Sequence, residues 1–175
     1  MKRVWIPLAA LLIASPASAQ MSHGGDASLA AVRGLYEMVR GYITAAAEQM
    51  PEADYAFKPT PEVRSFGQLV GHVANAGYLF CAGATGEKGP TVADAEKLAS
   101  KVEIVAALHA SFAFCDRAHQ MDPMKGGEAV DFFGQQHTRL SVLAFNMGHD
   151  FEHYGNMVTY LRLKGMVPPS SQRGM

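Results

Sequence analysis

The stretch TRLSVLAFNMGHDFEHYGNMVTYLRLK, residues 138–164, has the pattern of one long amphipathic helix. Thr138 is a residue type that caps helix N-termini, and Gly165 follows as the expected left-handed residue at the other end. At 3.6 residues per turn, one face of this helix carries positions 142, 145, 149, 153, 156 and 160. A helix of this length and pattern predicts a helical bundle, in which it packs against other helices.

Three further segments have the same helical period. The first is expected to begin at a cap, Asp26 or Ser28, and to run to about Ala47. The next two open with capping boxes, Ser65 with Gln68 and Ser100 with Glu103. The connector between them, residues 84–99, is expected to hold at most a short helical turn. No segment has a convincing strand pattern, so we predict an all-α, four-helix bundle with long loops.

The N-terminus has the features of an export signal. Lys2 and Arg3 precede a short apolar run, and a small-residue cleavage pattern ends at Ala19. An uncleaved membrane anchor is the alternative, but the run is shorter than the about 20 residues that span a bilayer. The predicted organisation is a signal peptide (1–19), a flexible linker (20–27) and a helical domain (28–171).

The charge balance excludes some partners. The chain has 15 Lys and Arg against 16 Asp and Glu; loss of Lys2 and Arg3 with the signal leaves 13 against 16, a net charge near −3. This is not the basic character that nucleic acid or an anionic membrane requires. We therefore expect an exported, periplasmic or secreted domain that has no nucleic-acid partner and no membrane association after cleavage.

Three histidines form the best candidate site. His149 and His153 lie one helical turn apart, about 6 Å at Cβ, so that two imidazoles can close on one ion at roughly 2.1 Å per bond. A third ligand must come from another element. His72 lies in the apolar stripe of the second helix, beside Leu69 and Val73. The alternative is that all three are hydrogen-bonded core residues, and the residue pattern by itself leaves both interpretations open.

The other histidines are weaker candidates. His23 falls in the expected linker, His109 and His119 fall toward the polar side of the third helix, and His137 lies at the edge of a loop. Glu152 has the chemistry to orient a ligand imidazole, although a solvated helix residue is the alternative.

Three segments resemble a known family. HDFEHYGNMVTYLRLKGMVPPSS (149–171) resembles the last helix of the DinB superfamily, and RSFGQLVGHVANAGYLFC (64–81) resembles its second helix. DYAFKPTPEVRS (54–65) resembles the loop that precedes this second helix. The similarity covers about residues 28–171. It implies a bundle in up-down-down-up order that carries a divalent ion, zinc or nickel, on His72, His149 and His153.

The resemblance also implies an activity. Characterised relatives are similar to thiol-dependent S-transferases and isomerases that act on small molecules with a low-molecular-weight thiol such as mycothiol, bacillithiol or glutathione. Those thiols are mainly cytosolic, whereas this chain has an export signal. Arg64 and Arg162 are each a candidate for a single contact with a thiol's carboxylates. A metal-dependent hydrolase, a non-catalytic metal-binding protein and a purely structural bundle remain alternatives, and a homodimer is suggested by the family alone.

The family's helix order bears on the two cysteines. Cys81 and Cys115 each lie about fifteen residues into their helices, so parallel second and third helices would place them level. A disulfide is then permitted, whereas an antiparallel pair of helices would forbid it. Two free, buried cysteines are the alternative.

Overall fold

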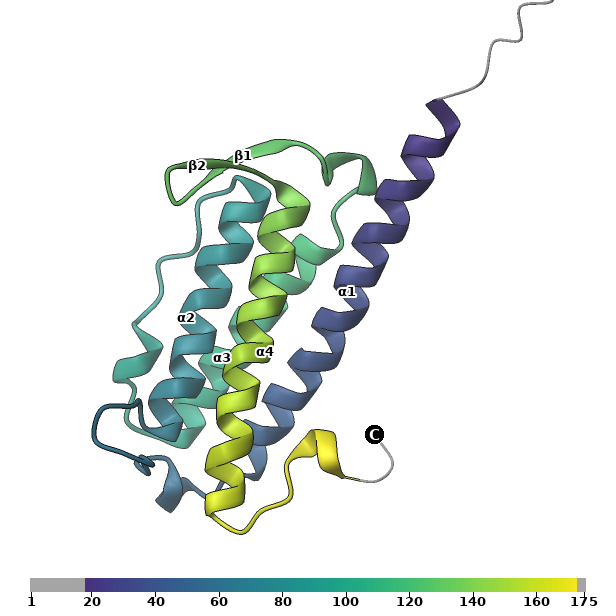
Figure 1. Cartoon of the computed structure of the whole chain (residues 1–175). Coiled ribbons are helices and arrows are strands. Elements are labelled where there is room, and N and C mark those ends of the chain that lie inside the picture. The colour runs from purple at the N-terminus through teal and green to yellow at the C-terminus, as the bar shows by residue number, and fades with distance from the viewer. Residues whose placement is uncertain (1–17, 173–175) are drawn as a thin grey trace, which may run out of the picture.

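The computed structural model describes residues 18–172, with their side chains from residue 26 onward. Its long elements are α1 (Ser18–Gln49), α2 (Phe66–Thr85), α3 (Lys101–His119), β1 (Ala129–Phe132), β2 (Gln135–Thr138) and α4 (Arg139–Leu163). Short 3₁₀ turns lie between or after them: η1 (Glu52–Asp54), η2 (Ala95–Lys97), η3 (Pro123–Lys125) and η4 (Pro169–Ser171). Figure 1 shows the four helices as a bundle, with the β1–β2 hairpin across one end. The predicted all-α, four-helix bundle is confirmed.

The helices run in up-down-down-up order. α2 and α4 are antiparallel neighbours, since Phe66 at the start of α2 contacts Tyr160 near the end of α4, with ring centroids 6.1 Å apart. α1 and α4 run in the same direction: Tyr42 stacks on Tyr154, and further along Gln49 donates a hydrogen bond to the carbonyl of Val167 just beyond α4. α2 and α4 lie side by side in the bundle (Figure 1).

α2 and α3 are also parallel, and they are covalently joined. Ser111 of α3 donates a 2.7 Å hydrogen bond to the carbonyl of Ala74 in α2. Further along both helices in the same direction, Cys81 and Cys115 form a disulfide with Cα atoms 5.3 Å apart. The bridge that the predicted helix order permits is therefore present, and neither cysteine is free.

The core is built from the predicted apolar stripes. Leu69 and Val73 of α2 and Ile104 and Leu108 of α3 are buried. On α1, Val39 and Ile43 are buried and Val32 is partly exposed. The fully buried side chains of greatest volume include Tyr36, Phe66, Ile43, Leu108 and Met157. Burial of these groups supplies the main stabilisation of the bundle.

The N-terminal boundaries of α2, α3 and α4 follow the predicted caps. Both side-chain hydrogen bonds of the capping box are present at Ser65 and Ser100, and Thr138 caps α4. Gly165 has a φ of 72°, the left-handed conformation expected after α4. None of the helices within residues 18–172 combines the length and apolar character of a membrane span.

The start of the first helix differs from the prediction. α1 already runs from Ser18, so residues 20–27 are helical in the structure rather than a separate linker, and neither Asp26 nor Ser28 is the cap. No proline lies between residues 18 and 49, so no proline interrupts the helix before Asp26 or Ser28. The predicted signal peptide (1–19) lies outside the described residues except for its last two.

The prediction of no strands is wrong. β1 and β2 pair antiparallel around Phe133 and Gly134, whose φ angles of 53° and 74° match a two-residue type I′ turn. Val130 and Phe132 are buried while Ala129 and Asp131 face solvent. The strands have four residues each, and a phenylalanine in the left-handed region is not a recognised hairpin signal. The pattern was therefore too short and its turn too unusual to be read from the sequence.

Candidate metal centre

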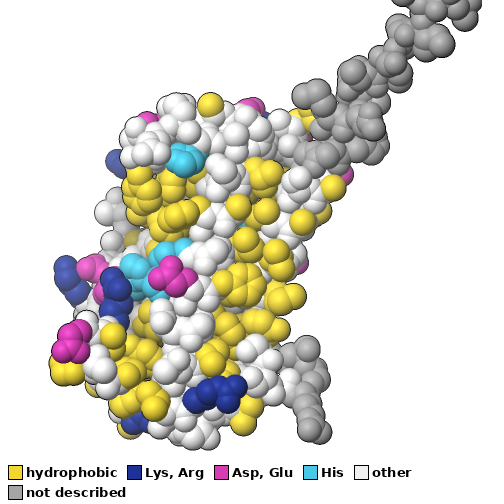
Figure 2. Space-filling view, in the orientation of Figure 1, with side chains coloured by type: hydrophobic (Ala, Val, Ile, Leu, Met, Phe, Trp, Pro, Cys, Tyr) yellow, Lys and Arg dark blue, Asp and Glu magenta, His cyan; other side chains and the backbone are white. Residues whose placement is uncertain are grey.

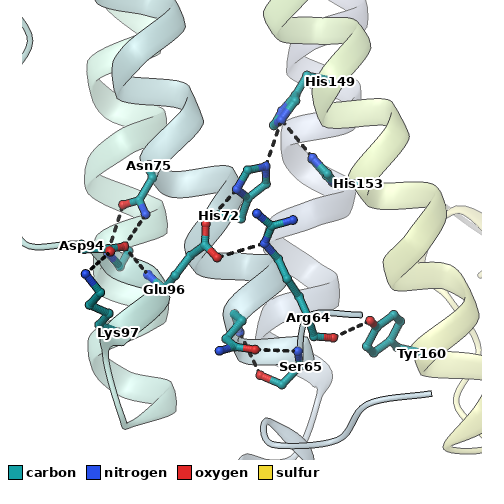
Figure 3. A network of polar contacts seen from close by, with 12 residues as sticks. Arg64, Ser65, His72, Asn75, Asp94, Glu96, Lys97, His149, His153 and Tyr160 are labelled. Carbon is teal, nitrogen blue, oxygen red and sulfur yellow. Dashed lines mark hydrogen bonds and ion pairs between the residues drawn. The ribbon is translucent and has the colours of Figure 1, made fainter. Parts of the chain in front are cut away.

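His72, His149 and His153 meet in the interface between α2 and α4. His149 and His153 project from successive turns of α4, and His72 faces them from α2 (Figure 3). The Nε2 atom of His149 lies 3.3 Å from Nε2 of His72 and 2.9 Å from Nε2 of His153. All three residues offer a ligand atom within 4.8 Å of the others.

This spacing suits a divalent ion. Tetrahedral coordination at about 2.1 Å per bond places ligand nitrogens about 3.4 Å apart, close to the two Nε2 separations observed. Among the described residues this is the one group of three or more His, Cys, Asp or Glu that converges in this way. The three histidines can therefore hold a metal ion, and a tetrahedral ion on them would have a fourth position for a water or a substrate.

Two of the imidazoles are held in the neutral form that metals bind. Burial, and after it the neighbouring His153, His72 and Arg64, lower the pKa of His149 to about 4. Burial also lowers the pKa of His153, with His72 contributing to the same shift. Since both shifts disfavour the imidazolium ion, these two histidines do not need to lose a proton to bind a cation near neutral pH.

Glu96 is an outer partner of the site that sequence reasoning missed. Its Oε1 lies 2.8 Å from Nδ1 of His72, and its Oε2 accepts a 2.9 Å hydrogen bond from Nε of Arg64. Partial burial raises the pKa of Glu96, but the hydrogen bonds from Arg64 and His72 outweigh it and the net shift is downward. The ionised carboxylate orients His72 with its Nε2 toward α4, the arrangement common around metal-binding histidines.

The contacts of Asp94 hold η2, the turn that carries Glu96, in place. Asp94 caps η2 by accepting a hydrogen bond from the amide of Glu96, and it also pairs with Asn75 of α2 and with Lys97 (Figure 3). A connector with no strong helical pattern therefore holds one carboxylate in a defined position. No local feature of the sequence distinguishes Glu96 from the other acidic residues of this connector.

A pocket of about 720 Å³ opens beside the histidines. Its wall includes His153, Arg64 and Tyr160, together with the apolar Leu69 and Val63. Figure 2 shows histidine side chains at the surface on this face of the molecule, with charged side chains next to them. A ligand in this pocket would therefore lie against His153.

An aromatic cluster lies on the other side of the site. Phe80 meets His149 edge to face with ring centroids 5.0 Å apart, and it contacts Phe145 at 5.1 Å. Phe132 and Phe133 of the hairpin complete the cluster. Apolar side chains are visible around the histidines in Figure 2. This cluster limits water access to one flank of the three histidines.

The other histidines whose side chains the structure describes lie away from the centre. His109 pairs with Glu48 on the surface, and His137 lies on β2 against Phe132. The side chain of His23 is outside the described residues. The placement of His119 on the polar side of its helix is wrong: it is 1% exposed and stacks on Tyr36 with ring centroids 3.8 Å apart, because the end of α3 packs against α1.

Glu152 does not orient a ligand histidine. It is exposed and lines the pocket beside His153. Its charge raises the pKa of His153, but no hydrogen bond joins it to a ring nitrogen within the described chain. Arg162 lies at the end of α4, where it bonds Ser171 rather than the site.

Comparison with solved structures identifies the same architecture. A DinB-like protein from Bacillus cereus superposes with a TM-score of 0.69 at 15% identity, covering 79% of this chain and 93% of that one. A DinB-like protein from Bacillus subtilis gives 0.61 at 22% identity, covering 81% and 98%. A conserved protein from Enterococcus faecalis gives 0.60 at 18% identity, covering 83% and 96%.

At these identities the structural likeness establishes the fold alone. No curated protein matches the chain. The model of the DinB superfamily matches residues 35–157, which include all three histidines. On this match the chain belongs to the DinB superfamily.

Proposed function

We propose that this protein binds one divalent ion, zinc or nickel, through His72, His149 and His153. The observation that carries the proposal is the convergence of three Nε2 atoms on one point between α2 and α4. Burial keeps two of the rings neutral, and Glu96 fixes the third. Neutral imidazoles can hydrogen-bond in pairs through these Nε2 atoms, whereas one cation satisfies all three nitrogens at once.

We further propose that the site is catalytic and acts on a small molecule. Such an ion, when bound, activates a thiol or a water molecule by lowering its pKa. The protein's own contribution is to hold three ligands, to leave one position free and to shape the pocket that reaches it. A closed structural site would have a fourth protein ligand and no adjoining pocket of about 720 Å³.

The reaction proposed first is transfer to or from a low-molecular-weight thiol, as the family resemblance implies. The pocket offers Arg64 for an anionic group and Tyr160 as a hydroxyl at its wall. Hydrolysis of a small-molecule substrate is the second candidate, because the same open position serves a water molecule equally well. A non-catalytic metal-binding role is the alternative to both.

Export to the periplasm or the exterior is a separate proposal. The Cys81–Cys115 disulfide supports it, since disulfides persist in oxidising compartments and are rare in the cytosol. A homodimer is also proposed. Leu35 and Met38 support it, because both expose apolar side chains on α1. Light scattering of the purified protein measures its oligomeric state and so tests the homodimer.

Elemental analysis tests the metal site. The mature protein is purified without chelator or affinity tag, beside His72→Ala, His149→Ala, His153→Ala and the surface control His109→Ala. We expect about one equivalent of zinc or nickel in the wild type and the control, and a loss in the three site variants. A wild type that retains no metal after reconstitution would exclude the proposed centre. With metal present, assays of thiol transfer and of hydrolysis separate the two reactions.

A further inference from the structure

Arg64 occupies a defined position at the mouth of the histidine cluster. Its backbone carbonyl accepts a 2.6 Å hydrogen bond from the hydroxyl of Tyr160, and the next residue, Ser65, caps α2. Its Nε donates to Glu96. The backbone and the base of the guanidinium are thus fixed by contacts to two other elements, although 44% of the side chain remains exposed.

The two terminal amino groups of Arg64 are not used by these contacts. Neither donates a hydrogen bond to any side chain or carbonyl within residues 18–172. In Figure 3 they point toward the space between His72 and His153. The charge of Arg64 lowers the pKa of both His149 and His153, which agrees with this proximity. A fixed guanidinium with free donors is preorganised to bind a planar anion such as a carboxylate.

The charges around the pocket favour one anionic group on the ligand. A divalent ion and Arg64 together outweigh the carboxylate of Glu96, so the inner wall would carry excess positive charge. Two exposed acidic residues, Glu62 and Glu152, line the same pocket. A negative group beside Arg64 is therefore stabilised, while a second negative group that faces Glu62 or Glu152 would be repelled.

We propose that Arg64 binds a carboxylate of the ligand, and that the site selects small thiols or substrates carrying a single negative charge next to the metal-binding atom. The inference rests on the proposed metal centre and deepens it. It assigns Arg64 two contacts, one to Glu96 inside the protein and one to the ligand.

The test uses matched small thiols on the zinc-loaded protein, with the dissociation constants measured by calorimetry. The probes are 3-mercaptopropionate, 2-mercaptoethanol and mercaptosuccinate, which carry one, no and two carboxylates. In the wild type we expect 3-mercaptopropionate to bind about tenfold more tightly than 2-mercaptoethanol, the ratio expected of one charge-assisted hydrogen-bonded pair at a partly exposed site. Mercaptosuccinate should bind no more tightly than 3-mercaptopropionate.

Variants separate ligand binding from support of Glu96. Arg64→Gln should reduce the tenfold preference to about onefold, Arg64→Lys should keep part of it, and Arg162→Gln should leave it unchanged. If Arg64 acted only by holding Glu96, Arg64→Gln would weaken zinc binding but leave the preference between the thiols intact, and that result would overturn the proposal. A tighter complex with mercaptosuccinate would overturn the single-charge selectivity. A wild type that binds zinc but neither thiol would refute the ligand assignment alone, whereas a wild type that binds no zinc would refute the metal centre as well.

Discussion

Gly71 of α2 lies directly against the backbone of Ala95 in η2. A Cβ atom at position 71 would collide with the carbonyl of Ala95 and would come within 2.8 Å of the amide nitrogen of Glu96. Only glycine permits this approach. Because η2 carries Glu96, the contact between Gly71 and Ala95 sets where that carboxylate meets His72, one residue further along α2.

Gly71→Ala should therefore damage both stability and metal binding. We expect the free energy of unfolding to fall by about 1–3 kcal/mol, the usual cost of overpacking, and the zinc affinity to fall because η2 moves away. Urea unfolding and a zinc titration measure the two effects. Gly34→Ala on α1 is the control: its Cβ would meet no atom within 4 Å, so it should raise stability by about 0.5–1 kcal/mol. Unchanged zinc affinity in Gly71→Ala would contradict the positioning role of this contact.

Glu96→Gln should weaken metal binding without unfolding the protein. The amide can still contact Nδ1 of His72, but it lacks the charge that holds the ring and raises its basicity. We expect the zinc affinity to fall by about 10–100-fold, as for other carboxylates that support a ligand histidine. Glu87→Gln, an exposed site after α2, should have no effect. Competition with a chromophoric chelator gives the zinc affinity of the wild type and of each variant. Equal affinities of the wild type and Glu96→Gln would mean that Glu96 is not part of the centre.

Removal of the disulfide should lower stability while leaving the fold intact. The Cys81–Cys115 bridge links residues 34 positions apart, so the double substitution to alanine should cost about 3–4 kcal/mol in the chain-entropy model. Urea unfolding of the double variant, with and without reductant, measures this loss. A reductant that destabilises the double variant as strongly as the wild type would show that the bridge is not the cause.

His119 should make the metal-free protein sensitive to acid. Burial, together with the charge of Arg33, lowers its pKa from 6.5 to about 4 in the fold. Between these values the unfolded chain binds a proton that the folded chain does not, so the free energy of unfolding falls as the pH decreases from about 6.5 to 4. His119→Phe, which preserves a ring against Tyr36, should remove up to about 1.4 kcal/mol per pH unit of this slope.

Part of the acid sensitivity should remain in that variant. His149 and His153 also have lowered pKa values, and they contribute in the same direction. Urea unfolding at several pH values between 7 and 4 gives the two slopes. An identical slope in His119→Phe and the wild type would exclude His119 as a source.

Asp150 should have the opposite pH dependence. It is 1% exposed, and burial raises its pKa to about 8, while the hydrogen bond from Asn146 opposes the shift. Between about pH 4 and pH 8 the folded protein holds a proton that the unfolded chain releases, so this residue destabilises the fold increasingly as the pH rises. Asp150→Asn should therefore stabilise the protein more at pH 8 than at pH 5, by on the order of 2–4 kcal/mol. A gain that is the same at both pH values would contradict this assignment.

Much of the bundle could be predicted because its signals are local. The capping boxes at Ser65 and Ser100, and the glycine at 165, specify helix ends through hydrogen bonds and backbone conformation within a few residues. The apolar period predicted which faces would be buried. The hairpin could not be predicted, because its two strands are short and its turn places Phe133 in a conformation that local rules assign to glycine or asparagine.

The candidate centre could be predicted only in part. The spacing of His149 and His153 puts both rings on one face of a helix, and His72 interrupts an apolar stripe, so all three were visible in the sequence. Glu96 was not, since its approach to His72 depends on how a 15-residue connector packs over Gly71. The burial of His119 was missed for the same kind of reason, because contact with Tyr36 of α1 decides it.

The sequence by itself determined the four helices, the three histidines and the family, since each depends on residue type and spacing along the chain. Tertiary structure alone decided which groups surround the histidines. The antiparallel packing of α2 on α4 brings the Nε2 atoms together, and the packing of η2 on α2 supplies Glu96 and, through it, Arg64. Contacts between segments more than twenty residues apart depend on how whole elements pack, and no local pattern encodes that.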